Sequence, residues 1–170
     1  SELLGELNVS HSSSSYSAFN PNADVTAALG IFYDYTYKGN GLKITEVIKD
    51  GPLAKAGMNI TAGMIIESID GELITPDKDL AQYLNRKAGK NTLLVIVDGT
   101  ARKEYSIKPI SIGEENGLLY KRWVNRNAEE VDKMSNGQLG YVHIPGMNDG
   151  AYRTTYEDIM GKYFLKKAIV

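Results

Sequence analysis

Alternation of apolar and polar positions dominates the middle of the chain and predicts a series of short β-strands. Residues 29–37 follow the period-two pattern of a half-buried strand, with apolar or aromatic side chains at Leu29, Ile31, Tyr33, Tyr35 and Tyr37. A turn at 38–41 and a second run over 42–48 predict a hairpin. Further short strands are expected over 64–69, 72–74, 92–98 and 102–108.

Two helices are predicted between these strands. Pro52 suits the first position of a short helix that Gly57 would end in a left-handed conformation. Thr75-Pro76 opens a second helix that Gly89 would close. Its expected inner face consists of Leu80, Ala81, Tyr83 and Leu84. The pattern over residues 26–112 therefore predicts a mixed α+β domain, which is a small β-barrel or sandwich with two helices.

Different patterns flank this domain on both sides. Residues 1–25 are expected to be the end of a helix followed by a small, polar loop. After the domain, three-four spacing predicts a long amphipathic helix over 118–134, ended by Asn136-Gly137. A strand at 138–144, a helix capped by Asp149 and an apolar run at the end then predict a parallel β-α-β crossover.

A lone crossover leaves its two-stranded sheet uncovered, because parallel sheets are normally buried on both faces. Residues 113–170 are therefore interpreted as the start of an α/β domain. The chain as a whole is expected to be a piece of a larger enzyme.

Composition excludes several classes of protein. A net charge of −2 over 170 residues gives no basic surface for nucleic acid. No apolar run approaches the roughly 20 residues that a membrane helix requires. Zero cysteines exclude disulfides and thiolate metal sites, and no spacing of acidic residues and histidines suggests a metal or a cofactor. Residues 1–7 lack the features of a signal peptide, and an exported bacterial location and a cytoplasmic one both stay open.

Candidate chemistry concentrates at Ser10-His11, where the chain offers a base beside a hydroxyl. The sequence has two histidines, so groups that could move a proton near neutral pH are few. His143 lies in a predicted strand and is interpreted as a packed or surface residue. The run Ser12 to Ser15 has the composition of a solvated linker and lacks the glycines of a nucleophile elbow.

The middle of the chain resembles a PDZ domain in its bacterial, circularly permuted arrangement. The resemblance is carried by AALGIFY at 27–33, GPLAKAGM at 51–58, AGMIIESIDGELI at 62–74 and DLAQYL at 79–84. Met64 departs from the bacterial pattern, which has aspartate there. The resemblance implies that an extended peptide adds as a strand beside residues 29–35 and that its C-terminal carboxylate meets the loop Leu29-Gly30-Ile31. Leu80 and Leu84 would then form the pocket for an apolar last residue, although both could equally belong to the core.

The flanking segments add a second resemblance, which covers almost the whole chain. ELNVSH at 6–11, RWVNRN at 122–127 and GYVHIP at 140–145 are similar to the tricorn protease core, a relative of the C-terminal processing peptidases. The resemblance implies a serine peptidase with a tetrad in which His11 is the base and Ser10 orients it. The nucleophilic serine and the glutamate of that tetrad have no counterpart in these 170 residues, so the chain alone is expected to be inactive.

Three alternatives stay open at this point. The chain could belong to a non-catalytic peptide-binding adaptor of proteolytic ancestry. The PDZ-like unit could instead be a structural insert in which Tyr33, Tyr35 and Tyr37 pack against the catalytic halves. An ordinary C-terminal processing peptidase uses a serine-lysine dyad and would leave Ser10-His11 unexplained. Expected partners are peptide or protein C-termini and the remainder of the protease core, and homo-oligomerisation of the parent stays open.

Overall fold

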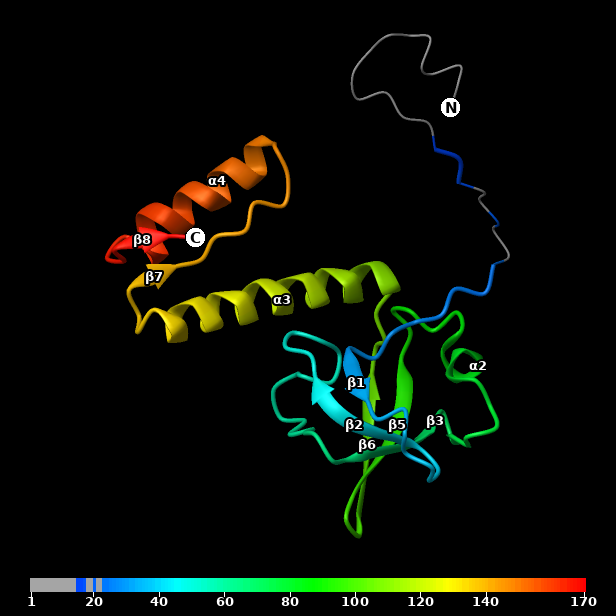
Figure 1. Ribbon diagram of the computed structural model, residues 1–170. Helices are drawn as coiled ribbons and strands as arrows, with labels where there is room; N and C mark the ends of the chain where they lie inside the picture. Colours follow the sequence, from blue (N-terminus) through cyan, green and yellow to red (C-terminus); the bar gives the residue numbers. More distant parts are fainter. Residues whose placement is uncertain (1–14, 18–19, 21–22) are drawn as a thin grey trace.

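The computed structural model describes residues 15–17, 20 and 23–170. Its strands and helices form two groups that the long helix α3 (Ile112–Met134) joins (Figure 1). One group is an antiparallel sheet with the short helix α2, and the other is a small β-α-β unit near the end of the chain.

The first group contains an open sheet of six strands. These are β1 (Ile31–Tyr33), β2 (Leu42–Val47), β3 (Ile65–Ile69), β4 (Glu72–Leu73), β5 (Thr92–Asp98) and β6 (Ala101–Ile107). Their order is β1-β2-β3-β5-β6, with β4 beside β3, and every pair is antiparallel. The mixed α+β class is confirmed, but the described strands form an open sheet and not a closed barrel. This leaves β1 at one edge.

The core lies between this sheet and α2 (Leu80–Leu84). Its most buried side chains come from alternating strand positions and include Ile44, Ile66, Leu94 and Ile107. The predicted turn at Asp70-Gly71 is confirmed, since both residues have positive φ angles and connect β3 to β4.

Helix α2 is much shorter than the predicted span from Thr75 to Gly89. It begins after Asp79, whose carboxylate accepts a hydrogen bond from the Ala81 N–H at 2.8 Å. It ends at Leu84 because the following backbone pairs with residues 25–27 instead. The Ala27 N–H donates to the Leu84 carbonyl, and the Arg86 N–H donates to the Val25 carbonyl.

Two other local predictions are also wrong. The strand expected over 29–37 is limited to Ile31–Tyr33, because the Asp34 carboxylate accepts hydrogen bonds from the Thr36 N–H and hydroxyl. This local turn competes with strand pairing. The segment from Pro52 to Gly57 forms two turns and no helix, although Gly57 has the predicted positive φ angle.

Helix α3 begins six residues before the predicted start because of an overlooked capping box. The Ser111 hydroxyl accepts from the Glu114 N–H, and the Glu114 carboxylate accepts in turn from the Ser111 backbone N–H. The predicted end is confirmed, since Asn136 and Gly137 both have positive φ angles. The helix has no fully buried residue.

The second group confirms the parallel crossover. It consists of β7 (Leu139–Gly140), α4 (Asp149–Glu157), the π-helical turn η1 (Asp158–Lys162) and β8 (Ala168–Ile169). Strands β7 and β8 are parallel, and the ladder continues where the Val142 N–H donates to the Val170 carbonyl. The residue that caps α4 is Asn148 and not Asp149, because the Asn148 side chain accepts from the Ala151 N–H at 2.9 Å.

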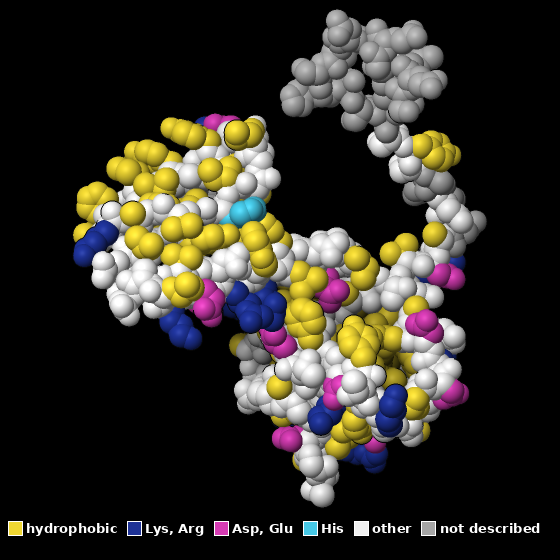
Figure 2. Space-filling view, viewed as in Figure 1, with side chains coloured by type: hydrophobic (Ala, Val, Ile, Leu, Met, Phe, Trp, Pro, Cys, Tyr) yellow, Lys and Arg dark blue, Asp and Glu magenta, His cyan; other side chains and the backbone are white. Residues whose placement is uncertain are grey.

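Apolar side chains cover much of the surface of the β7-α4-β8 unit (Figure 2). The most exposed of them are Met147, Tyr152, Phe164 and Leu165. In the described ranges, no helix combines the length and the apolar character that crossing a bilayer requires.

Substitution of Gly140 tests the packing of the β7-α4-β8 unit. A Cβ atom at Gly140 would lie 2.6 Å from Cγ of the buried Tyr163, whereas one at Gly161 would meet nothing within 4 Å. We expect Gly140→Ala to destabilise the unit by about 1–3 kcal/mol, and Gly161→Ala to change its stability by less than about 0.5 kcal/mol. Amide hydrogen exchange at Val142 and Val170 measures the difference, and equal protection in both variants would contradict the packing.

Candidate peptide-binding site

The loop Leu29-Gly30-Ile31 leads into β1, whose first residue is Ile31, and is held by backbone hydrogen bonds. Ala28 and Ile110 exchange two such bonds, at 2.8 and 2.9 Å. The Gly30 carbonyl accepts a third from the Ile48 N–H at 2.9 Å. The backbone of the loop is therefore fixed by contacts with distant segments of the chain.

Gly30 is required at the centre of this loop for two independent reasons. Its φ angle is +67°, a region that L side chains adopt only with strain. A Cβ atom here would also lie 2.8 Å from Cδ of Pro52. The motifs at 27–33 and 51–58 thus meet at the close contact between Gly30 and Pro52.

The Gly30 amide already holds a carboxylate oxygen. Its N–H donates to Oε1 of Glu115 at 3.1 Å, across a sequence separation of 85 residues. Glu115 lies in the first turn of α3, next to the capping box. The loop therefore meets a carboxylate from the chain itself at the position where the PDZ resemblance implies a peptide carboxylate.

The four apolar residues predicted to form the groove divide into two pairs. Leu29 and Leu84 are 4% and 2% exposed and belong to the core cluster. Ile31 and Leu80 are only partly buried and pack against the outside of that core. Only Ile31 and Leu80 offer side-chain surface that a ligand could contact without rearrangement of the core.

Strand β1 and helix α2 face one another across this partly buried surface. Burial raises the pKa of Tyr33 on β1 to about 12, with smaller contributions from Tyr35 and from the negative charge of Asp79 at the start of α2. Among the described strands, β1 pairs with β2 alone, so its other edge faces away from the sheet. An exposed strand edge beside a helix is the geometry that accepts an added peptide strand.

Helix α3 also contacts strands β1 and β2 through Arg122. The Arg122 guanidinium donates two hydrogen bonds at 2.5 Å to the Glu46 carboxylate on β2. The same guanidinium lies over the Phe32 ring on β1, 4.9 Å from its centroid. The hydrogen bonds to Arg122 hold the pKa of Glu46 below its usual range. Arg122 thereby fixes α3 against the strands that form the groove.

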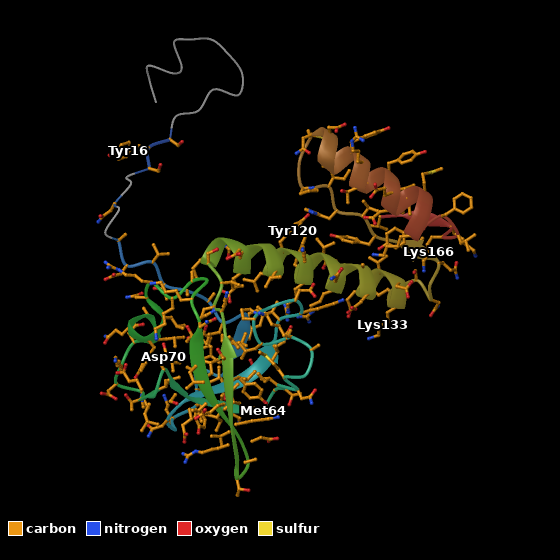
Figure 3. The ribbon with its side chains drawn as sticks, turned by 180° about the vertical axis from the view of Figure 1, so that it is seen from behind. Tyr16, Met64, Asp70, Tyr120, Lys133 and Lys166 are labelled. Atoms are coloured by element: carbon orange, nitrogen blue, oxygen red, sulfur yellow. The ribbon has the colours of Figure 1, made fainter. Side chains whose placement is uncertain are left out.

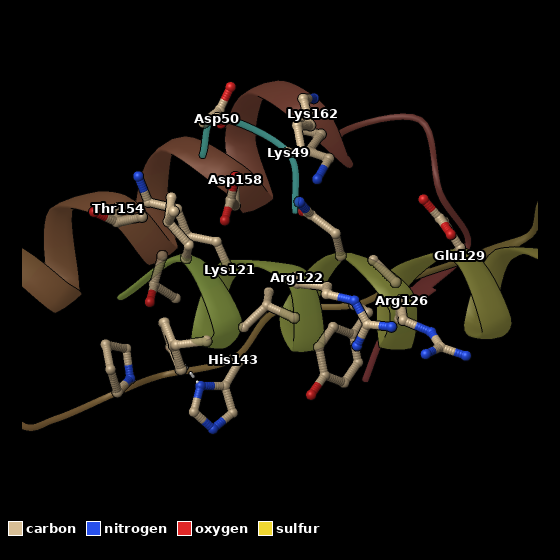
Figure 4. Close-up of a pocket in the computed structure, with 18 of the residues that line it drawn as sticks. Lys49, Asp50, Lys121, Arg122, Arg126, Glu129, His143, Thr154, Asp158 and Lys162 are labelled. Atoms are coloured by element: carbon tan, nitrogen blue, oxygen red, sulfur yellow. Dashed lines mark hydrogen bonds between the residues drawn. The ribbon is translucent and has the colours of Figure 1, made fainter. Parts of the chain in front are cut away.

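A large open crevice separates α3 from α4. It has a volume of about 1240 Å³ and mixes charges of both signs (Figure 4). Its labelled lining residues include Lys121, Arg122 and Arg126 on α3 and Asp158 and Lys162 beyond α4. Within the described part of the chain, no three acidic, histidine or cysteine side chains cluster as metal ligands would.

His143 lies at the edge of this crevice and is a packed residue, as predicted. Its Nδ1 is 2.7 Å from the Tyr120 hydroxyl, and its ring meets the edge of Trp123. At the opposite end of α3, Nζ of Lys166 donates to Asp132 and to the Gly137 carbonyl. Tyr120 and Lys166 thus attach the β7-α4-β8 unit to α3 at two separate places (Figure 3).

Ser10 and His11, the predicted catalytic pair, lie outside the described residues, as does the helix expected over 1–9. The contacts that the sequence analysis missed are those of Glu115 and Arg122. The S-x-x-E pattern of the capping box could have placed Glu115 in the first turn of α3. No local signal pairs Arg122 with Glu46, since they meet only through the tertiary fold.

An antiparallel sheet with a glycine loop before its edge strand and a short helix beside it defines a PDZ domain. Residues 28–111 match the family described as the tricorn protease PDZ domain. The chain is 28% identical to the tricorn protease homolog of Saccharolobus solfataricus over 99% of its own length and 16% of the relative's. It is 25% identical to the tricorn protease of Thermoplasma acidophilum over 86% of its length and 14% of the relative's.

A solved structure agrees with these relatives. The crystal structure of the tricorn protease shares the fold, with a TM-score of 0.68 and 21% identity over 81% of this chain and 14% of that chain. The chain is similar to the segment of the tricorn proteases that contains their PDZ domain. It spans about a sixth of the length of the curated relatives that it matches.

Replacement of Gly30 tests the construction of the loop. We expect Gly30→Ala to cost about 2–4 kcal/mol of unfolding free energy, because backbone strain adds to the overlap with Pro52. Gly63→Ala is the matched control, since Gly63 also has a positive φ angle but a Cβ atom there would meet nothing within 4 Å. It should cost only about 1–2 kcal/mol. Urea unfolding measures both, and equal costs would contradict the contact with Pro52.

The pair Glu46–Arg122 predicts a pH dependence of stability. Because the folded pKa of Glu46 is lowered, its contribution is fully present above the ordinary glutamate pKa and is lost as pH falls through the folded value. The Glu46 side chain is 42% exposed, so the contribution is only about 0.5–1 kcal/mol. Glu46→Gln should lose this amount at pH 7 and progressively less as pH falls through the folded pKa of Glu46.

Urea unfolding over this pH range, with Glu104→Gln on β6 as the exposed control, measures the effect of Glu46. A stability difference between Glu46→Gln and the unmodified chain that does not shrink as the pH is lowered from 7 would show that the pair is not the cause.

Proposed function

We propose that this chain is the peptide-guiding segment of a tricorn-type serine endopeptidase, and that its PDZ domain captures the C-terminal end of peptides. The observation that carries the proposal is the contact between the Gly30 N–H and a carboxylate oxygen at 3.1 Å. The similarity to tricorn proteases over 99% of the chain supports the enzymatic context. The chain covers 16% of that relative, and the activity proposed is that of the protease as a whole.

In the proposed binding mode, a peptide extends the sheet beside β1. Its terminal carboxylate accepts from the Gly30 amide, and main-chain hydrogen bonds along the strand edge provide affinity. Leu80 on α2 and Ile31 on β1 contact the last side chain, since both are partly exposed next to the core. This apolar surface favours a ligand that ends in an aliphatic residue.

For catalysis, the proposal keeps the roles that the tricorn resemblance implies. His11 takes the proton of the nucleophilic serine and later passes it to the leaving amine, while Ser10 holds the imidazole in the productive tautomer. The nucleophile and the glutamate come from other parts of the protease. The 170-residue chain alone is therefore expected to hydrolyse no peptide bond.

Activity of the protease that contains this chain tests the catalytic part. His11→Ala should lower kcat at least about a thousandfold, as loss of a catalytic base does in other serine proteases. Ser13→Ala, from the neighbouring serine run, is the control and should leave kcat unchanged. Unchanged hydrolysis in the His11→Ala protein would remove the assignment.

A titration of the 170-residue chain tests the binding part. The probe is a hexapeptide that ends in leucine, with either a free carboxylate or an amidated C-terminus. Amidation should weaken binding at least about tenfold, because it removes the charged acceptor for the Gly30 amide. Leu80→Ser should weaken both forms. Equal affinity for the two peptides would contradict capture of a carboxylate.

One observation favours a second role, in which the PDZ domain is a structural insert. Arg122 on α3 contacts both Phe32 and Glu46, and this joins the domain to the rest of the chain through strands β1 and β2. If neither peptide binds, the structural role accounts for the domain.

A further inference from the structure

The Glu115 side chain leaves its own helix to reach the carboxylate-binding loop. We propose that Glu115 is an internal ligand of the loop Leu29-Gly30-Ile31, and that a peptide C-terminus binds by displacing it. The inference rests on the proposed binding function and adds a residue that sets the affinity of the same site. The hydrogen bond from the Gly30 N–H to Glu115 Oε1 is its starting point.

Stabilisation of the N-terminus of α3 does not require this orientation of the Glu115 side chain. The capping box is complete without it, because Oε2 of Glu114 accepts from both the backbone N–H and the hydroxyl of Ser111 at 2.8 Å. The Glu115 backbone N–H is also satisfied, by the Ser111 carbonyl at 3.0 Å. The glutamate at position 114 stabilises the helix, and the one at position 115 binds a different part of the molecule.

The fold holds Glu115 close to the loop. The two hydrogen bonds between Ala28 and Ile110 join the loop to the residue just before the helix cap. From Ile110, one turn of helix brings Glu115 next to Gly30. An anion tethered over so short a distance has a high effective concentration at the amide, so it competes with any free carboxylate in solution.

A second contact allows Glu115 to leave the loop while α3 stays attached. Arg122 lies seven residues after Glu115, a spacing that places both on one face of the helix. Its hydrogen bonds to Glu46 and its contact with Phe32 involve neither Gly30 nor Glu115. Rotation of the Glu115 side chain is then sufficient to open the loop.

Competition by an internal carboxylate has a defined consequence for ligands. The apparent dissociation constant rises by the reciprocal of the fraction of molecules in which the loop is open. A free C-terminal carboxylate can replace the interaction that Glu115 gives up. An amidated C-terminus cannot replace the charge. It binds the open loop more weakly, while Glu115 reduces the affinity for both peptides by the same factor.

The experiment measures dissociation constants of the 170-residue chain and three variants. The probe is the leucine-terminated hexapeptide with a free carboxylate, and its amidated form is the second ligand. Glu115→Ala removes the competitor, and Glu115→Gln keeps the shape but removes the charge. Glu130→Gln is the control, because Glu130 is an exposed glutamate of the same helix.

We expect Glu115→Ala to bind the free-carboxylate peptide about three- to thirtyfold more tightly, the gain that loss of one charge-assisted hydrogen bond predicts. Glu115→Gln should show a smaller gain, since its amide oxygen still accepts from Gly30. The affinity of Glu130→Gln should equal that of the unmodified chain. Should Glu115→Ala unfold, the isosteric Glu115→Gln still shows whether the charge competes.

Two results would overturn the inference, and they differ in what they leave standing. If all proteins bind the free-carboxylate peptide equally and amidation weakens it, carboxylate capture holds and Glu115 is no competitor. If neither peptide binds any variant, the proposed binding function fails and the inference fails with it.

Discussion

The pair of backbone hydrogen bonds between Ala28 and Ile110 is the constraint on which the site depends. It joins the segment before the edge strand to the segment that enters α3. Gly30 then turns with a positive φ angle against Pro52, and Ser111 caps the helix one residue after Ile110. The carboxylate-binding loop and α3 are therefore built as one structure.

This arrangement makes α3 the common support of the two groups of elements. On one face, Glu115 contacts the loop, and Arg122 contacts strands β1 and β2. Tyr120, which lies between these two residues in the sequence, meets His143, and Lys166 bonds to Asp132 near the C-terminal end of the helix. The helix has no fully buried residue, so its position is set by polar and aromatic contacts more than by a hydrophobic seam.

Local sequence patterns made most of the sheet predictable. A local turn explains the early end of one strand, and tertiary contacts explain the early end of one helix. Two-residue turns such as Asp70-Gly71 require positive φ angles. Because Asp-Gly adopts such angles readily, the residue types alone indicate the turn. The long strand expected after Leu29 ended early because Asp34 forms a local turn, and α2 ended early because residues 25–27 pair with the backbone after Leu84. The PDZ groove was predicted by resemblance, but its contact with Glu115 spans 85 residues and has no local signal.

The central claim is that the Gly30 amide recognises a carboxylate, and its NMR signal tests this most directly. In a 15N-labelled chain, the free-carboxylate hexapeptide should shift the Gly30 amide resonance in a saturable manner, since one carboxylate replaces another beside that proton. The amidated peptide at the same concentration should leave it much less affected. The account would be contradicted if neither peptide changed the chemical shift of the Gly30 amide, or if both changed it equally.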